Sequence, residues 1–188
     1  MAYKDIFRDE TRDRVCEILQ DMGINAKMSE RGRPEESVGL RPYFKSLGMI
    51  EIAEGPIRWV NVIRKKIAHK TEYFLNYGVP DPRLDSASPK VLFKSEPERK
   101  LIIFGKISDL TWEGEDSGTG IIDRIKSDGS LKETIIKSKV VFTITAYGKG
   151  GYWIISSSYS ELLVSPTHFP SEQEWRSCQM IAHHLLAD

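Results

Sequence analysis

Two acidic residues and a lysine in the middle of the chain are the first side chains whose types and spacing could carry chemistry. Asp81 follows Pro80, and Glu98 stands two residues before Lys100. Two carboxylates can hold a divalent cation, and a neighbouring lysine can orient the attacking water molecule. This chemistry requires all three side chains to converge from adjacent strands. The spacing therefore raises the hypothesis of a metal-dependent enzyme.

The types and spacing of these residues resemble the PD-(D/E)xK motif of metal-dependent nucleases. That resemblance implies Asp81 and Glu98 as metal ligands and Lys100 as the residue beside the water. The context differs from the motif, because residues 96–100 read as a polar turn ahead of a strand. We expect two solvated loops here and keep a nuclease-like protein, active or degenerate, as the alternative interpretation.

A second version of this alternative places the acids in the N-terminal half, where Glu30, Glu35 and Glu51 accompany a helix, a charged loop and a hairpin. The basic run at residues 64–66 favours it. The second strand of that hairpin, however, reads Val-Asn-Val at 60–62, where a lysine would be required. Any metal site built there would be incomplete.

The other motif-like residues point to ordinary structural roles. No two of the four histidines are spaced i, i+4, the spacing that places two ligands on one helical face. Cys16 and Cys178 each fall in an expected amphipathic helix and are read as small buried side chains. The glycine-rich run at 148–151 leads into a strand, so we expect a hairpin turn and not a phosphate-binding loop. We therefore expect no cofactor.

Composition and charge restrict the classes of partner. The 27 basic and 27 acidic residues cancel, so nucleic acid is not favoured by net charge. The first residues lack the pattern of a signal peptide, and no apolar run is long enough to cross a membrane. We expect a soluble protein in the cytoplasm, with no membrane association.

Hydrophobic periodicity and turn residues predict the order of the elements. We expect a helix at 9–22, a charged loop at 29–46, a hairpin of 49–53 with 57–64, and a short helix at 67–77. We then expect an antiparallel meander and a final amphipathic helix at 172–186. The expected strands of the meander are 91–94, 101–112, 120–127, 131–137, 140–147 and 152–163.

Two turns predict strand registers. Asp128-Gly129 is typical of a two-residue hairpin turn, which would place Ile122 opposite Ile135 and Arg124 opposite Glu133. The turn at 148–151 would place Tyr147 opposite Tyr152, Ile144 opposite Ile155 and Ala146 opposite Trp153. One face of this second hairpin is then apolar core. Its other face carries hydroxyl and aromatic side chains that are either solvated or line a cavity: Thr143, Thr145, Tyr147, Tyr152, Ser156 and Ser158.

These elements predict an α+β fold, an antiparallel meander of about seven to eight strands between N-terminal and C-terminal amphipathic helices. Residues 1–80 form a possible subdomain and residues 81–188 the rest, unless the chain is one single domain. In broad layout, residues 57–186 resemble the helix-grip or START-like architecture. That resemblance implies a ligand cavity between the sheet and the terminal helix.

The sequence names no reaction, and our leading hypothesis is a non-enzymatic binding or interaction module. A small-molecule ligand would occupy a pocket between the sheet and the C-terminal helix. The aromatic residues we expect around it are Trp59, Tyr147, Tyr152, Trp153 and Trp175. A protein partner or a homodimer, bound through the charged loop or a strand edge, is the third class of function.

Overall fold

A computed structural model gives the structure of residues 10–40, 42–67, 70–86, 88, 91–99, 107–159 and 169–187. Within these residues, eight strands form one antiparallel sheet in the order β1-β2-β3-β4-β8-β7-β5-β6. The strands are β1 (Ala26–Met28), β2 (Phe44–Ile52), β3 (Trp59–Ile67), β4 (Lys70–Pro80), β5 (Leu92–Arg99), β6 (Ile107–Glu115), β7 (Val140–Tyr147) and β8 (Tyr152–Tyr159). The predicted fold class, an antiparallel α+β fold with a helix near each end, is confirmed.

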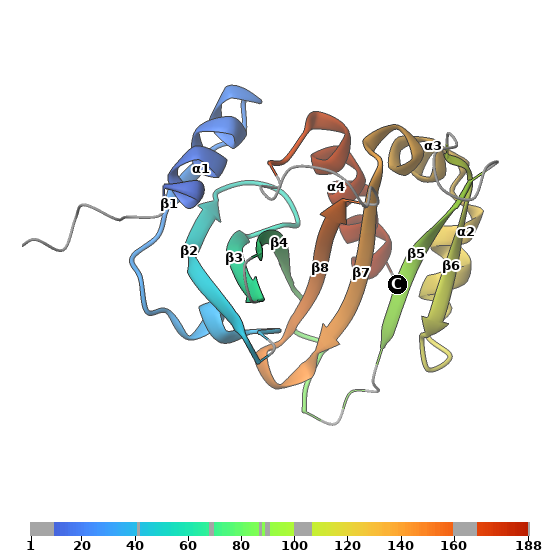
Figure 1. Ribbon diagram of the computed structural model, residues 1–188. Coiled ribbons are helices and arrows are strands. Elements are labelled where there is room, and N and C mark those ends of the chain that lie inside the picture. The colour runs from blue at the N-terminus through green and yellow to red at the C-terminus, as the bar shows by residue number, and fades with distance from the viewer. Residues whose placement is uncertain are drawn as a thin grey trace, which may run out of the picture.

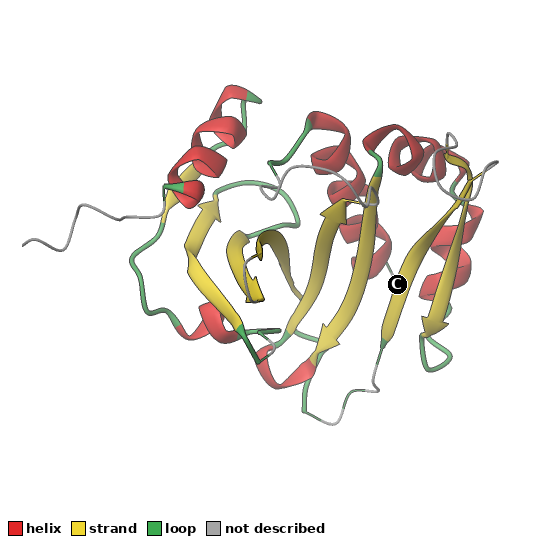
Figure 2. Cartoon of the chain, viewed as in Figure 1, coloured by secondary structure: helices red, strands yellow, loops and turns green. Residues whose placement is uncertain are grey.

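The helices pack on one face of this curved sheet, and Figures 1 and 2 look onto the other face, with α4 behind β7 and β8. The helices are α1 (Thr11–Asp21), α2 (Ile121–Ser127), α3 (Gly129–Ser138) and α4 (Glu172–Leu186), with short 3-10 turns η1 (Pro34–Ser37) and η2 (Gly148–Gly150). The main core lies between them and the sheet. Leu19 of α1, Ile125 of α2, Leu131 of α3 and Ile181 of α4 all reach this core, where each is at most 1% exposed.

The two terminal helices were predicted well. In α1, Val15 and Leu19 face the core, and Gly23 ends the helix with a positive φ of 78° while the Ile24 amide donates to the Leu19 carbonyl. Helix α4 begins after Ser171, whose hydroxyl accepts a hydrogen bond from the Glu174 amide at 3.2 Å. The expected N-cap of the first helix, Asp9, lies outside the described residues.

Both cysteines are buried, as predicted. Burial raises the pKa of the Cys178 thiol well above its usual value, and burial is also the largest cause that raises the pKa of Cys16. Among the helices in the described ranges, none is long and apolar enough to cross a membrane.

The two hairpins predicted from alternation are present. Strands β2 and β3 pair as expected, with Glu51 opposite Trp59, although both are longer than predicted and β2 already begins in the expected loop. The register of β7 with β8 is the predicted one throughout, from Tyr147 opposite Tyr152 to Ile144 opposite Ile155. Its apolar face, including Phe142, is buried in the main core.

The predicted helix at 67–77 is wrong, because this stretch belongs to strand β4. Its side chains alternate at period two, with Leu75, Tyr77 and Val79 fully buried on the helix-covered face. Gly78 does not end a helix, but pairs with Trp59 of β3 inside the sheet. The aromatic and β-branched side chains of this strand pack on the pleated surface, which outweighs local helix propensity.

The predicted strands at 120–127 and 131–137 are also wrong, because they form α2 and α3. Asp128 is not part of a hairpin turn but the N-cap of α3, where its carboxylate accepts from the Leu131 amide at 2.9 Å. The predicted pairs of Ile122 with Ile135 and Arg124 with Glu133 therefore do not form. Burial of Leu131, Thr134, Ile135 and Ser138 follows a helical period instead.

The sheet runs across the boundary that the sequence offered between 1–80 and 81–188. Strand β4 pairs with β8, with Gly78 opposite Ile154. The short linker after β4 is also tied to the β7–β8 hairpin, because the Asp81 amide donates to the Gly151 carbonyl at 2.9 Å. Whether residues 1–80 act as a subdomain stays a prediction.

Candidate functional site

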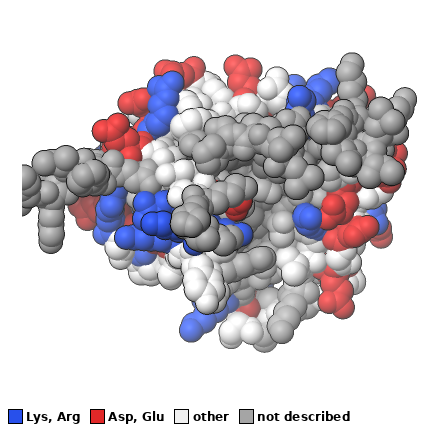
Figure 3. Space-filling view, in the orientation of Figure 1, with Lys and Arg blue, Asp and Glu red and all other residues white. Residues whose placement is uncertain are grey.

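The face of the sheet that carries no helix, here called the open face, is polar at its centre. Strand pairing sets one row across it, in which Asn61 of β3 lies opposite Asn76 of β4, Asn76 opposite Ser156 of β8, and Ser156 opposite Thr143 of β7. The polar-aromatic face predicted for the β7–β8 hairpin therefore continues onto β4 and β3. Figure 3 shows lysine and arginine side chains gathered at the left of this face, on the side of β2.

Residues 29–40, here called the covering segment, fold over one end of the open face. The Asn61 amide nitrogen donates to the Glu36 carbonyl at 2.9 Å, and the Ser46 hydroxyl donates to the Asn61 side-chain oxygen at 2.6 Å. Val38 inserts into a small apolar cluster with Met49, Trp59 and Ile154. This part of the charged loop predicted at 29–46 is thus anchored to the sheet.

Trp59 is placed by close packing against a glycine. A Cβ atom built on Gly78 would lie 2.0 Å from the indole ring, so only glycine at this position leaves room for the ring. The ring of Tyr152 meets the indole edge-on, with centroids 5.6 Å apart. Trp59 is only 3% exposed and lines one of two cavities that involve this face.

The first cavity, here called the polar cleft, has a volume of about 280 Å³. It is lined by Gly39, Phe44, Ile63, Phe74, Asn76, Leu92, Thr143, Thr145, Tyr147, Ile154, Ser156, Ser157 and Ser158. Asn76 is 5% exposed, and its side-chain amide makes no hydrogen bond to any part of the chain that the structure describes. The same holds for the hydroxyls of Thr143 and Ser156. These polar groups point at the space and not at each other.

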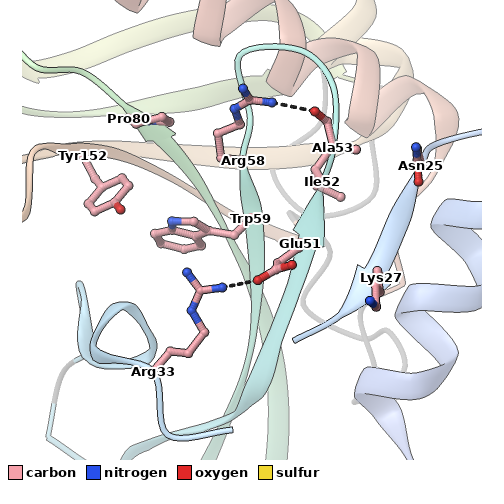
Figure 4. A pocket seen from close by; sticks show the side chains of 10 residues that line it. All are labelled: Asn25, Lys27, Arg33, Glu51, Ile52, Ala53, Arg58, Trp59, Pro80 and Tyr152. Carbon is pink, nitrogen blue, oxygen red and sulfur yellow. Dashed lines mark hydrogen bonds and ion pairs between the residues drawn. The ribbon is translucent and has the colours of Figure 1, made fainter. Parts of the chain in front are cut away.

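The second cavity, here called the arginine cavity, has a volume of about 410 Å³ and is drawn in Figure 4. It is lined by Asn25, Lys27, Arg33, Glu51, Ile52, Ala53, Arg58, Trp59, Pro80 and Tyr152. Arg33 forms ion pairs with Glu35 and Glu51. Its hydrogen bond to Glu35 is the largest cause that raises the pKa of Arg33, and the same bond lowers the pKa of Glu35.

The five aromatic residues predicted around one pocket fall in three places. Tyr147 lines the polar cleft, whereas Trp59 and Tyr152 line the arginine cavity. Trp153 and Trp175 lie on the helix-covered side, where the Trp175 ring packs edge-on against Tyr77. A ligand-binding role for these aromatic residues stays a prediction.

The sheet beneath α4, where the sequence placed the pocket, is filled by side chains. Tyr77, Cys178 and Ile181 are fully buried there. The Tyr77 hydroxyl donates to Glu174 at 2.6 Å, and burial raises the pKa of this tyrosine well above its usual value. Neither the polar cleft nor the arginine cavity includes a residue of α4.

Asp81 and Glu98, two of the residues predicted for a metal site, have different surroundings. Asp81 is buried and accepts hydrogen bonds from the Trp153 indole at 2.9 Å and from the Arg83 guanidinium at 2.9 and 3.0 Å. Glu98 is exposed on β5 opposite Asp109, and Lys100 lies outside the described residues. Asp81 therefore serves as a structural acceptor.

The second set of predicted acids meets an arginine instead of a metal. Glu35 and Glu51 converge, but each is paired with Arg33. In the portion of the chain with described coordinates, no three acidic, histidine or cysteine side chains are grouped so that they could hold a metal ion. The nuclease interpretation stays a prediction, to which these residues give no support.

The chain matches no protein-family model, no curated protein and no solved structure. Function must therefore be argued from the site alone. Sequence reasoning missed Asn76, because a helix was predicted at 67–77, and it missed Arg58, which no motif marks. The alternation of hydroxyl side chains along 143–158 was the signal for a polar face here, although the sequence placed the pocket on the other side of the sheet.

Proposed function

We propose that the protein is a non-enzymatic binding module that takes a small molecule in the polar cleft of its open face. The observation that carries the proposal is Asn76, an amide that is almost fully buried, lines a cavity and has no hydrogen-bond partner among the described residues. The Asn76 amide opens onto the cavity, so a bound ligand can use both its N–H donors and its carbonyl acceptor.

The lining of the cleft defines the chemistry of the ligand. The residues that line it carry no charge, which favours a neutral molecule. Its floor offers hydroxyls, such as those of Thr143 and Ser156, which both donate and accept hydrogen bonds. Its rim is apolar, with Phe44 and Phe74 in contact at a centroid distance of 5.5 Å. We therefore propose a neutral ligand with several hydroxyl or amide groups and one apolar end, such as a short alkyl glycoside.

The proposed site differs from the one inferred from sequence, although the class of function is the same. The sequence placed the ligand between the sheet and the C-terminal helix, whereas the polar cleft lies on the opposite face. The volume of about 280 Å³ lies just below the range of about 300–1,000 Å³ that is typical of small-molecule sites. A ligand of about the size of a monosaccharide with a short alkyl chain suits it.

The test is a titration of isotope-labelled protein followed by NMR. The probes are octyl glucoside below its micelle concentration, glucose, and benzoate as a charged comparison. We expect octyl glucoside to shift the side-chain amide signals of Asn76 and to bind more tightly than glucose, with no shift from benzoate. The double variant Thr143→Val, Ser156→Ala removes two hydroxyls that bond to nothing described, so it should fold normally and bind at least tenfold more weakly.

The matched control is Thr111→Val, which changes an exposed threonine on β6, away from the cleft. It should leave the affinity unchanged. Unchanged binding in the double variant, or shifts that spread over the helix-covered face and spare Asn76, would contradict the proposal.

A further inference from the structure

The arginine cavity collects positive charge from three separate segments. Lys27 comes from β1, Arg33 from the covering segment and Arg58 from the turn just before β3, and all three line the same space. Glu51 is the one acidic residue among the ten that line it. In Figure 4, Arg58, Arg33 and Tyr152 surround the Trp59 ring on three sides. The lining therefore carries a net charge of two positive units, from three cations and one carboxylate.

Two of these cations form no ion pair with the described residues. Arg33 is paired with both Glu35 and Glu51. Arg58, in contrast, is exposed, and among the described residues it donates only to the Ala53 carbonyl, at 2.7 Å, so most of its guanidinium donors face solvent. Lys27 makes no ion pair within the described residues. Cations brought together without counter-charges repel one another, and an anion between them removes this repulsion.

A buried donor in the same lining also lacks an acceptor. The indole N–H of Trp59 is inaccessible to water and has no hydrogen-bond partner among the described residues. The ring cannot turn to find one, because Gly78 and Tyr152 hold it. An unsatisfied buried donor is uncommon in folded proteins and calls for an explanation. Because water does not reach this N–H, an oxygen atom of a bound anion would accept from it only after a small shift of the neighbouring side chains.

We propose that the arginine cavity binds the carboxylate or phosphate group of a small molecule that also carries a flat apolar ring. Arg58 and Lys27 hold the oxyanion, since a guanidinium matches carboxylate and phosphate oxygens in pairs. Tyr152 and Pro80 line the cavity beside the charged groups and receive the ring. This site is distinct from the polar cleft, because the two cavities have no lining residue in common.

The test uses benzoate, phenyl phosphate and the neutral benzyl alcohol, titrated into labelled full-length protein. The readout is the indole N–H signal of Trp59, assigned by its loss in Trp59→Phe. We expect this signal to shift with benzoate or phenyl phosphate, and the comparison of the two identifies the preferred anion. Benzyl alcohol has the same ring without the charge and should bind at least tenfold more weakly. Higher salt should weaken binding of the anions.

Matched variants separate a specific site from general charge attraction. Arg58→Gln should weaken anion binding at least tenfold, and Arg58→Lys should weaken it less, because a lysine keeps the charge but not the paired donors. Lys126→Gln removes the same charge from α2 on the other side of the sheet and should leave affinity unchanged. If Arg58→Gln unfolds, Lys27→Gln at an exposed position of β1 serves instead.

Three outcomes would overturn this inference. They are equal binding of benzyl alcohol and benzoate, an equal loss of affinity in Lys126→Gln, and the absence of any Trp59 shift at about 10 mM of either anion. None of these outcomes bears on octyl glucoside in the polar cleft, so the two proposals fail or succeed separately.

Discussion

The two faces of the sheet differ in what surrounds their buried polar side chains. On the helix-covered face, several of these side chains bond to one another, as Tyr77 does to Glu174 and Trp153 to Asp81. On the open face, Asn76 and the Trp59 indole are also buried, yet neither has a hydrogen-bond partner among the described residues. Buried nitrogen atoms without a described hydrogen-bond partner also occur among the helices, at Arg12 Nε and Arg124 Nε, but Asn76 and Trp59 differ from them because each lines a cavity that has room for a bound molecule.

Along the single strand β7, the side chains that stabilise the core and those that line the proposed site lie on opposite sides. Successive residues of β7 point to opposite faces, so Phe142 is fully buried among the helices while its neighbour Thr143 lines the polar cleft. The same backbone therefore supports the core with one side and the proposed site with the other. Substitutions on the core side should therefore lower stability, whereas substitutions on the cleft side should lower ligand affinity.

The largest effect is expected from Phe142→Ala. Removing a fully buried ring from the main core should lower the free energy of unfolding by about 3–5 kcal/mol. The neighbouring change Thr143→Val should alter it by less than about 0.5 kcal/mol. Urea denaturation followed by circular dichroism measures both. Similar losses for the two variants would show that the faces do not differ as described.

A second effect is expected where the open face is most tightly packed. In Gly78→Ala, the added methyl group meets the Trp59 ring at 2.0 Å and should lower the free energy of unfolding by about 1–3 kcal/mol. The double variant Gly78→Ala, Trp59→Leu should recover part of this loss, since the smaller side chain makes room. Gly129→Ala is the control, because a Cβ there meets nothing within 4 Å. A double variant that is no more stable than Gly78→Ala would contradict the packing described.

The third prediction concerns pH. Burial acts to raise the pKa of Asp81, but hydrogen bonds from Arg83 and Trp153 outweigh it, and the pKa is lowered. A lowered pKa contributes stability above the pKa of the unfolded chain, about 3.9, and this stability is lost as the pH falls through the lower folded value. Asp81→Asn should therefore cost about 2 kcal/mol at pH 7 and less at about pH 3. A pH-independent difference in unfolding free energy would contradict it.

The smallest effect on stability is expected for Thr143→Val, Ser156→Ala. These hydroxyls bond to no described residue, so the free energy of unfolding should change by less than about 0.5 kcal/mol. The octyl glucoside affinity of the same variant should fall at least tenfold. Thermal unfolding with and without the probe measures both quantities. A large loss of stability without ligand would mean that the polar cleft is part of the core.

The sequence predicted those parts of the molecule in which local signals and tertiary packing agree. Helix α4 has its N-cap at Ser171 and a clear apolar stripe, and the β7–β8 hairpin has both alternation and a glycine turn. The prediction failed where one local sequence signal is compatible with two different structures. Asp128-Gly129 serves equally as a hairpin turn or as a helix N-cap with the first helical residue, and only packing against α4 selects the second.

The candidate site was predicted only in part, for the same reason. Side chains at 143–158 could be assigned to one face because alternation fixes their orientation within a hairpin. The position of β4 between β3 and β8 depends on long-range pairing, so Asn76 and the polar row that includes it could not be anticipated. Arg33 and Arg58 lie far apart in the sequence, and only the covering segment brings them to one cavity.

The contact between Trp59 and Gly78 has a consequence for the history of this chain. Any other residue at position 78 requires a smaller side chain at position 59, so Gly78 can change only where Trp59 has also changed. A relative that has lost this glycine should also have lost the tryptophan and, with it, the indole donor of the arginine cavity. The presence of both residues on neighbouring strands is thus a mark by which distant relatives that keep this cavity can be recognised.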